Sequence, residues 1–187
     1  RAGPQLGDTA VVFGAGAIGL LVLLLLRAAG IRELAAVDLN EARLRWAQRL
    51  GASLSLNARE VDVARALRER FVEGVDIAVD AVGSSGTRLA SALSVRRGGR
   101  VVLLGLHENS LNLDGNYVVR NEVEVLGSFA YSDGDFERAT ALVNQGLAGL
   151  QEGWIDIRPL EEGQEAFRRV AEGVEGYPKV LLSAHRP

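Results

Sequence analysis

Short apolar runs alternate with longer amphipathic runs along the first two thirds of the chain. This alternation is typical of a parallel sheet covered by helices on both faces. The apolar runs predict strands near residues 9–13, 33–37, 53–56, 75–80, 100–104 and 122–126. Six strands in this alternation predict a doubly wound, Rossmann-type α/β fold with the strand order 3-2-1-4-5-6.

The helices between these strands are predicted from the spacing of apolar residues and from capping residues. A helix over 17–29 follows the first strand directly, a second begins after Asn40 and ends at Gly51, and a third covers 62–71. The residues expected on the buried sides of the second and third helices are Leu44, Ala47, Leu50, Val63, Leu67 and Phe71.

A fourth helix begins at 84–85, and its expected buried residues are Leu89, Ala92 and Leu93. We expect this helix to close at 96–99, with Arg96 and Arg97 at the negative end of the helix dipole. Asp76 and Asp80 flank the strand at 75–80, where we expect them to cap turns rather than to form a catalytic pair.

The rhythm changes after about residue 128. Two helices are predicted near 135–144 and 161–172, and 179–183 is predicted to be a strand with no strand partner adjacent in sequence. A lone strand and two amphipathic helices cannot close a core, so we expect this tail to pack on something else. The predicted division is therefore 1–128 and 129–187.

Composition narrows the classes of partner. The net charge of −3 and the evenly mixed charges provide no basic face, which argues against nucleic acid. The chain has no cysteine and two histidines, which excludes disulfides and zinc–thiolate sites. The longest apolar run, 17–26, is shorter than the ~20 residues that span a bilayer. We expect a cytoplasmic protein, and the start at Arg1 without any methionine suggests an excised fragment.

The sequence Gly14-Ala-Gly16-Ala-Ile-Gly19 joins the first strand to the first helix, and Asp38 follows at the end of the second strand. This spacing is that of a dinucleotide-binding turn, whose glycines allow the tight turn, the approach of a diphosphate and close helix–strand packing. The helix dipole then favours the phosphates. We expect cofactor contact at this turn, including Ala17 and Ile18; the alternative is a glycine-rich turn that binds nothing.

Asp38 is placed to accept hydrogen bonds from both adenosine ribose hydroxyls. A 2′-phosphate there would bring two anions together, which favours NAD over NADP. Capping of the following helix is the alternative role, and both roles can hold at once. Ala81, Val82 and Gly83 follow the fourth strand, at the edge where such sheets bind ligands, and leave room for the adenosine half.

Taken in order, several segments resemble the medium-chain dehydrogenase/reductase superfamily, most closely its zinc-type alcohol and polyol dehydrogenases. The matching pieces are Gly7-Asp-Thr-Ala-Val-Val-Phe-Gly-Ala-Gly-Ala-Ile-Gly-Leu20, Val37-Asp-Leu-Asn-Glu-Ala-Arg-Leu44, Gly51-Ala52, Gly74-Val-Asp-Ile-Ala-Val-Asp-Ala-Val-Gly83, Gly98-Gly-Arg-Val-Val-Leu-Leu-Gly105, Leu126-Gly-Ser128 and Lys179-Val-Leu-Leu182.

The resemblance implies the nucleotide-binding domain of an NAD-dependent enzyme acting on a small alcohol or polyol, followed by a tail that returns to a catalytic domain. That N-terminal domain, which supplies the zinc ligands in the family, is absent here. We therefore expect the fragment to bind NAD without catalysis, and we assign it no catalytic residue and no metal.

The resemblance also implies roles for further residues. Arg43 is expected over the adenine face, and Lys179 is expected to reach the pyrophosphate. The residues whose backbone is expected to approach the nicotinamide are Leu104, Gly105, Leu106, Ser128 and Phe129. The resemblance gives no role to His107, which lies in a polar loop.

The segment 109–114 alternates polar and apolar residues near the predicted edge of the sheet. Relatives dimerise by pairing edge strands, so we expect a homodimer through this region. Three other functions stay open at this point: a zinc-free quinone-reductase-like enzyme, a non-enzymatic NAD sensor and, least favoured, an S-adenosylmethionine methyltransferase.

Overall fold

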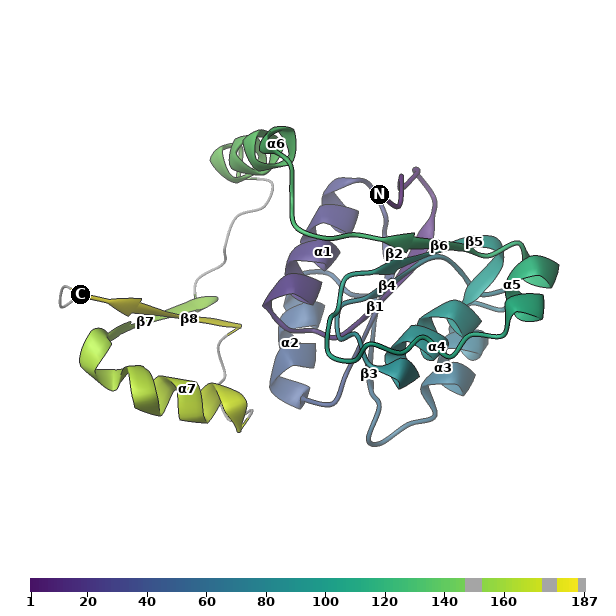
Figure 1. Ribbon diagram of the computed structural model, residues 1–187. Helices are drawn as coiled ribbons and strands as arrows, with labels where there is room; N and C mark the ends of the chain where they lie inside the picture. The colour runs from purple at the N-terminus through teal and green to yellow at the C-terminus, as the bar shows by residue number, and fades with distance from the viewer. Residues whose placement is uncertain (147–152, 173–177, 185–187) are drawn as a thin grey trace. The chain divides into compact units, whose positions relative to one another are not determined.

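The computed structural model describes residues 1–146, 153–172 and 178–184 (Figure 1). It divides into two compact units, Arg1–Ala148 and Gly149–Pro187. The predicted functional boundary at 128/129 remains a prediction.

The first unit is built on a six-stranded sheet in the order β3-β2-β1-β4-β5-β6, in which every neighbouring pair is parallel. The strands are β1 (Thr9–Phe13), β2 (Glu33–Asp38), β3 (Leu54–Asn57), β4 (Val75–Asp80), β5 (Val95–Leu103) and β6 (Glu124–Gly127). The predicted doubly wound fold and strand order are confirmed. The order reverses between β1 and β4, so the chain leaves these two neighbours toward opposite faces of the sheet.

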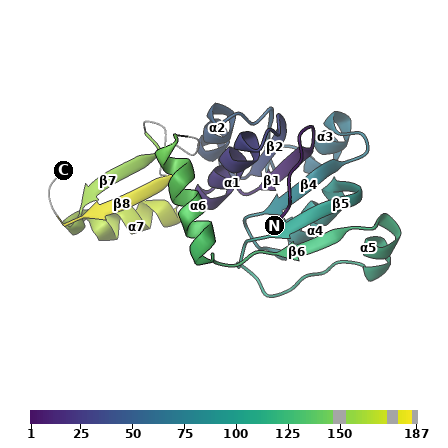
Figure 2. The ribbon, with the colours of Figure 1, turned by 90° about the horizontal axis from the view of Figure 1, so that it is seen from above.

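Helices cover both faces of this sheet (Figure 2). The unit contains α1 (Ala17–Ala28), α2 (Glu41–Arg49), α3 (Val63–Arg70), α4 (Ser85–Ser94), α5 (Gly115–Asn121) and α6 (Asp133–Asn144). One face carries α1 and α2, and the other carries α3, α4 and α5.

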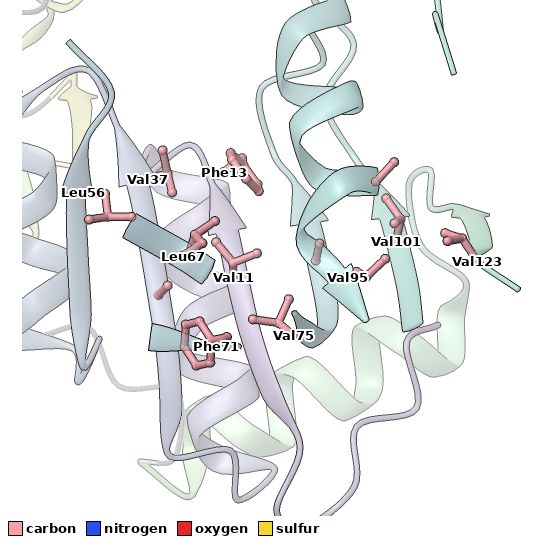
Figure 3. Close-up of a cluster of buried hydrophobic side chains, with 13 residues drawn as sticks. Val11, Phe13, Val37, Leu56, Leu67, Phe71, Val75, Val95, Val101 and Val123 are labelled. Atoms are coloured by element: carbon pink, nitrogen blue, oxygen red, sulfur yellow. The ribbon is translucent and has the colours of Figure 1, made fainter. Parts of the chain in front are cut away.

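The core follows the two-residue period of the central strands. Val11 and Phe13 belong to the cluster beneath α3 and α4 (Figure 3). Val12 faces the opposite way, because a Cβ added to Gly19 of α1 would lie 3.4 Å from its Cγ1. Both faces of these strands are therefore buried, as expected for a parallel sheet between two helical layers.

The predicted end of the fourth helix is wrong. α4 ends at Ser94, and β5 begins at once at Val95, so Arg96 and Arg97 lie in a strand. Arg96 forms an ion pair with Asp76, and Arg97 forms one with Glu122. Their charges therefore balance specific carboxylates rather than a helix dipole.

Asp76 was also misassigned as a turn cap. Its carboxylate accepts hydrogen bonds from the amide and hydroxyl of Thr9, at 2.7 and 2.9 Å, and from Nε of Arg96 at 2.6 Å. Burial raises the pKa of Asp76, but these hydrogen bonds and the charge of Arg96 outweigh it and hold the pKa below its ordinary value of 3.8. Asp76 thus ties β1 to β5 at the amino edge of the sheet.

The buried face of α4 differs from the predicted one. Ala92 is buried as predicted, but Leu89 and Leu93 are exposed, and Arg88 and Ser91 are buried instead. The small side chains of Ser91 and Ala92 suit a helix that contacts β4 and β1. The two leucines line a groove between α3 and α4.

The second unit contains β7 (Ile155–Pro159), the 3₁₀ turn η1 (Leu160–Glu162), α7 (Gly163–Ala171) and β8 (Lys179–Ser183). β7 and β8 pair in parallel from Ile155 opposite Lys179 to Pro159 opposite Ser183. The expectation of a lone final strand is therefore wrong. The strand β7 was missed because it is short and ends in a proline.

Residues 109–114 form no strand. The described strand at this edge of the sheet is β6, so the expected edge strand at 109–114 is a wrong prediction. Nowhere in the described ranges is there a helix long and apolar enough to cross a membrane.

Candidate functional site

The turn from β1 to α1 depends on two of its glycines. Gly14 has a φ of +92°, and its amide donates to the Val37 carbonyl at 2.7 Å. A Cβ on Gly19 would lie 1.8 Å from the Gly14 oxygen, so the first turn of α1 fits against the strand only with glycine there. Two of the predicted glycine roles, the tight turn and the close packing, therefore match the geometry.

The N-terminus of α1 carries no protein cap. Its N-cap residue is Gly16, no side chain accepts its first N–H groups, and a Cβ added to Gly16 would meet nothing within 4 Å. Every other described helix of the first unit begins at a side-chain cap. Those capping residues are Asn40, Asp62, Ser84, Asp114 and Ser132. This one helix therefore presents unpaired N–H donors and open space at the carboxyl edge of the sheet.

Asp38 lies beside this turn, at the end of β2. Its Oδ2 accepts from the Ala15 amide at 2.7 Å, and its Oδ1 accepts from the Asn40 amide at 2.9 Å. The side chain is 8% exposed, and the Arg43 guanidinium lies 4.0 Å from Oδ2. The carboxylate is thus fixed against the glycine turn, with a cation at its outer side.

The second turn at this edge follows β4. The carboxylate of Asp80 is fully buried and accepts from the amides of Val82 and Gly83 at 3.0 Å, so this aspartate caps the turn as predicted. The Ala81 amide donates to the Phe13 carbonyl at 2.9 Å, which joins this turn to the end of β1.

The segment after β5 lies against the β4–α4 turn. A Cβ on Gly83 would lie 2.2 Å from the Gly105 carbonyl carbon, and one on Gly105 would lie 2.1 Å from the Gly83 amide nitrogen. The amides of Leu104 and Gly105 both donate to the Asp80 carbonyl. Leu106, the next residue, is 75% exposed.

The segment after β6 lies at the same edge. The Ser128 amide donates to the Leu103 carbonyl at 3.0 Å, and Phe129 is 82% exposed. The fold therefore brings together the predicted residues from Gly14 to Phe129. Lys179 begins β8 in the second unit, so its part in the site stays a prediction.

Two functional candidates were not predicted. Arg88, on α4, is 8% exposed and donates to the carbonyls of Ser110 and Gly105. The Glu108 carboxylate accepts from the Ser85 amide at 2.8 Å, which adds a second acidic group to the start of α4. The sequence signal for Arg88 is a cation within a helix that packs on a buried sheet; Glu108 carries none.

No set of three or more histidine, cysteine, aspartate or glutamate side chains in the described residues is placed to hold a metal ion. The donors on the page therefore do not fit a zinc ion. By contrast, the open, uncapped Gly16 turn does fit the diphosphate of a dinucleotide, because such a ligand needs unpaired N–H groups and close backbone approach.

The strand order, the glycine turn and the acidic residue after β2 define a doubly wound α/β domain of dinucleotide-binding architecture. A sequence profile described as "Zinc-binding dehydrogenase" matches residues 17–145, which is more than half of the chain. The chain belongs to this zinc-type branch of the medium-chain dehydrogenase/reductase family.

Individual relatives agree with this placement. "Probable D-xylulose reductase A" of Aspergillus terreus is 32% identical over 172 residues, which cover 89% of this chain and 49% of the relative. The structure of 2R,3R-butanediol dehydrogenase from Bacillus subtilis superimposes with a TM-score of 0.85 at 27% identity, covering 99% of this chain and 53% of the other.

A putative zinc-binding dehydrogenase from Sinorhizobium meliloti 1021, in a structure bound to NADP, gives a TM-score of 0.81 at 29% identity. That match covers 88% of this chain and 49% of the other. The chain spans about half the length of the curated relatives it matches.

Proposed function

We propose that this chain is the coenzyme-binding portion of an NAD-dependent alcohol or polyol dehydrogenase. The observation that carries the proposal is the start of α1, which has open space at Gly16 and no side-chain cap. The names of the relatives, a D-xylulose reductase and a butanediol dehydrogenase, support an alcohol or polyol substrate for the whole enzyme.

The diphosphate would be held by the N–H groups at residues 16–19. These groups have no intrahelical acceptor, and the positive end of the α1 dipole favours an anion there. The exposed Ile18 side chain and Val82 would border the dinucleotide without competing for hydrogen bonds.

Asp38 would bind the adenosine ribose and select NAD. Two like unit charges 4 Å apart repel by about 4 kcal/mol at an intermediate dielectric constant of 20, so a 2′-phosphate beside this carboxylate would be disfavoured. Arg43 offsets part of that repulsion. Without Asp38, the same guanidinium would attract a 2′-phosphate.

The nicotinamide ring would lie near the segments after β5 and β6, beside Gly105, Leu106 and Phe129. When bound, the coenzyme supplies hydride transfer to or from the substrate carbon, and these residues would orient the ring and shield it from water. We propose that the zinc ligands and the substrate pocket of the whole enzyme lie outside this chain, and that the chain alone binds NAD without turnover.

Equilibrium titration with NADH and NADPH tests the proposal. The wild-type chain should bind NADH saturably and more tightly than NADPH, and Asp38→Ala should lower NADH affinity and reverse the preference. Adding Arg43→Ala to that variant should remove the gain for NADPH. Unchanged NADH affinity in Asp38→Ala would contradict the ribose assignment, and no saturable binding by the wild type would contradict the function.

We also propose a homodimer, with the interface moved from 109–114 to the neighbouring edge strand. β6 is an outer strand of the described sheet, and its Val125 side chain is exposed. An open strand edge can pair with a second copy across a two-fold axis. Sedimentation should give a dimer that Val125→Lys dissociates; a monomer in the wild type at tens of micromolar would contradict it.

A further inference from the structure

We infer that Arg88 is a positioning residue, which holds the loop after β5 in place and so sets the nicotinamide side of the site. The inference rests on the proposed function for its consequence in binding. Its structural half, that Arg88 orders this loop, stands independently of any ligand.

The loop in question covers residues 104–112, which form neither helix nor strand. Backbone carbonyl groups in such a segment need donors from elsewhere when they are withdrawn from water. The guanidinium of Arg88 donates from one terminal nitrogen to the Ser110 carbonyl at 2.6 Å and from the other to the Gly105 carbonyl at 3.2 Å. One side chain thus joins both ends of the loop to α4.

The same guanidinium reaches the neighbouring turn. Its Nε lies 3.9 Å from Oδ2 of Asp80, and that carboxylate caps the turn through the amides of Val82 and Gly83. The Asp80 carbonyl in turn accepts from the Leu104 and Gly105 amides. Arg88 therefore sits where the β4–α4 turn and the β5 loop meet.

Stability alone does not explain a cation at this place. Arg88 is 8% exposed and its Nε has no hydrogen-bond partner, while Asp80 is fully exposed to no solvent at all. Replacing a buried ion pair by apolar side chains is often neutral or stabilising. A planar fork of donors, however, is what two separated carbonyl groups require, and no apolar side chain or single ammonium group provides it.

Three further contacts hold the loop to the start of α4 without fixing Gly105. The Glu108 amide donates to the Gly83 carbonyl, its carboxylate accepts from the Ser85 amide, and the Asn112 amide side chain donates to Ser85 Oγ. If Arg88 is replaced, these contacts keep the loop attached. The carbonyls of Gly105 and Ser110 then lose their donors, so the expected change is local.

The test compares the full-length chain with Arg88→Met, which keeps the length but removes the donors, and Arg88→Lys, which keeps the charge. Arg68→Met, at an exposed arginine on α3, is the matched control. Hydrogen exchange without ligand reports the loop, and titrations with ADP and NADH report the adenosine half and the whole coenzyme.

For Arg88→Met we expect exchange over 104–112 to rise at least tenfold, with exchange over 14–38 unchanged. NADH affinity should fall at least tenfold while ADP affinity stays within twofold, because ADP does not reach the β5 loop. Arg88→Lys should lie between, and Arg68→Met should match the wild type. If Arg88→Met fails to fold, Arg88→Lys carries the same test with smaller differences.

Unchanged exchange in the loop would overturn the inference. A parallel loss of ADP and NADH affinity would also overturn it, since that result marks general destabilisation. Failure of the wild type to bind NADH or ADP would instead overturn the proposed function, and the exchange result would still decide whether Arg88 orders the loop.

Discussion

The molecule contains two glycine-rich turns at the same edge of one sheet, and it treats them in opposite ways. The turn from β1 to α1 begins an uncapped helix, with open space where a Gly16 side chain would lie. The turn from β4 to α4 is filled: Asp80 caps it from within, Ser84 and Thr87 form a capping box, and Gly105 contacts Gly83. We interpret the filled turn as a support and the open turn as the place for a ligand.

The largest effect is expected from emptying the filled turn. Asp80→Ala should lower the free energy of unfolding by about 4 kcal/mol, because it leaves the buried Arg88 charge uncompensated and two amides without an acceptor. Urea unfolding measures this loss. Asp80→Asn keeps one acceptor oxygen and should lose less; an equal loss in both variants would place the whole effect in the charge.

The same substitution at the two turns should give different results. Gly83→Ala should cost about 3 kcal/mol, because its φ is +87° and the new Cβ would overlap the Gly105 backbone. Gly16→Ala should change the free energy of unfolding by less than about 1 kcal/mol, because its φ of −73° and the open space both accept a methyl group. Equal losses in the two variants would contradict the comparison.

A capped helix should lose stability on removal of its cap. Asn40→Ala should lower the free energy of unfolding by about 1 kcal/mol, because the Asn40 side chain accepts from the Ala42 and Arg43 amides. Arg45→Ala, at an exposed position on the same helix, is the control and should stay within about 0.5 kcal/mol. A loss in Asn40→Ala no larger than that of the control would show that the cap is not needed.

The smallest predicted effect separates this edge from the opposite one. Because hydrogen bonds lower the pKa of Asp76 in the folded state, its carboxylate adds stability above about pH 3.8, and this contribution is lost as the pH falls through the folded-state pKa. Asp76→Asn should be less stable than the wild type at pH 7, and the difference should shrink below that pH. An unfolding series from pH 7 to pH 2 checks this, and a constant difference would contradict it.

Local chemistry made the open turn predictable from the sequence. Gly14, Gly16 and Gly19 act within six residues of one another, and Asp38 lies at the end of the next strand. Their roles depend on backbone angles and on the positions of strand ends, which short-range patterns specify well. The strand order followed from the same alternation.

The filled turn depends on contacts that are distant in sequence, and here prediction was less complete. Arg88 meets Ser110 across 22 residues, and nothing in the local pattern indicates that an arginine rather than Leu89 faces the sheet. Likewise β7 is stabilised by β8, more than twenty residues away, so a search for adjacent strands missed it. In each case the partner decided the outcome, and the partner is not visible in the local sequence.

The most direct test of the open turn is NADH binding to the Gly16→Asp variant. An aspartate at this position can cap α1 and interacts favourably with its dipole, so the unfolding midpoint should stay the same or rise. The same carboxylate would occupy the N–H groups proposed for the diphosphate and repel it. The account therefore predicts that NADH affinity falls at least tenfold in a protein of equal or greater stability, and NADH binding at wild-type affinity would contradict it.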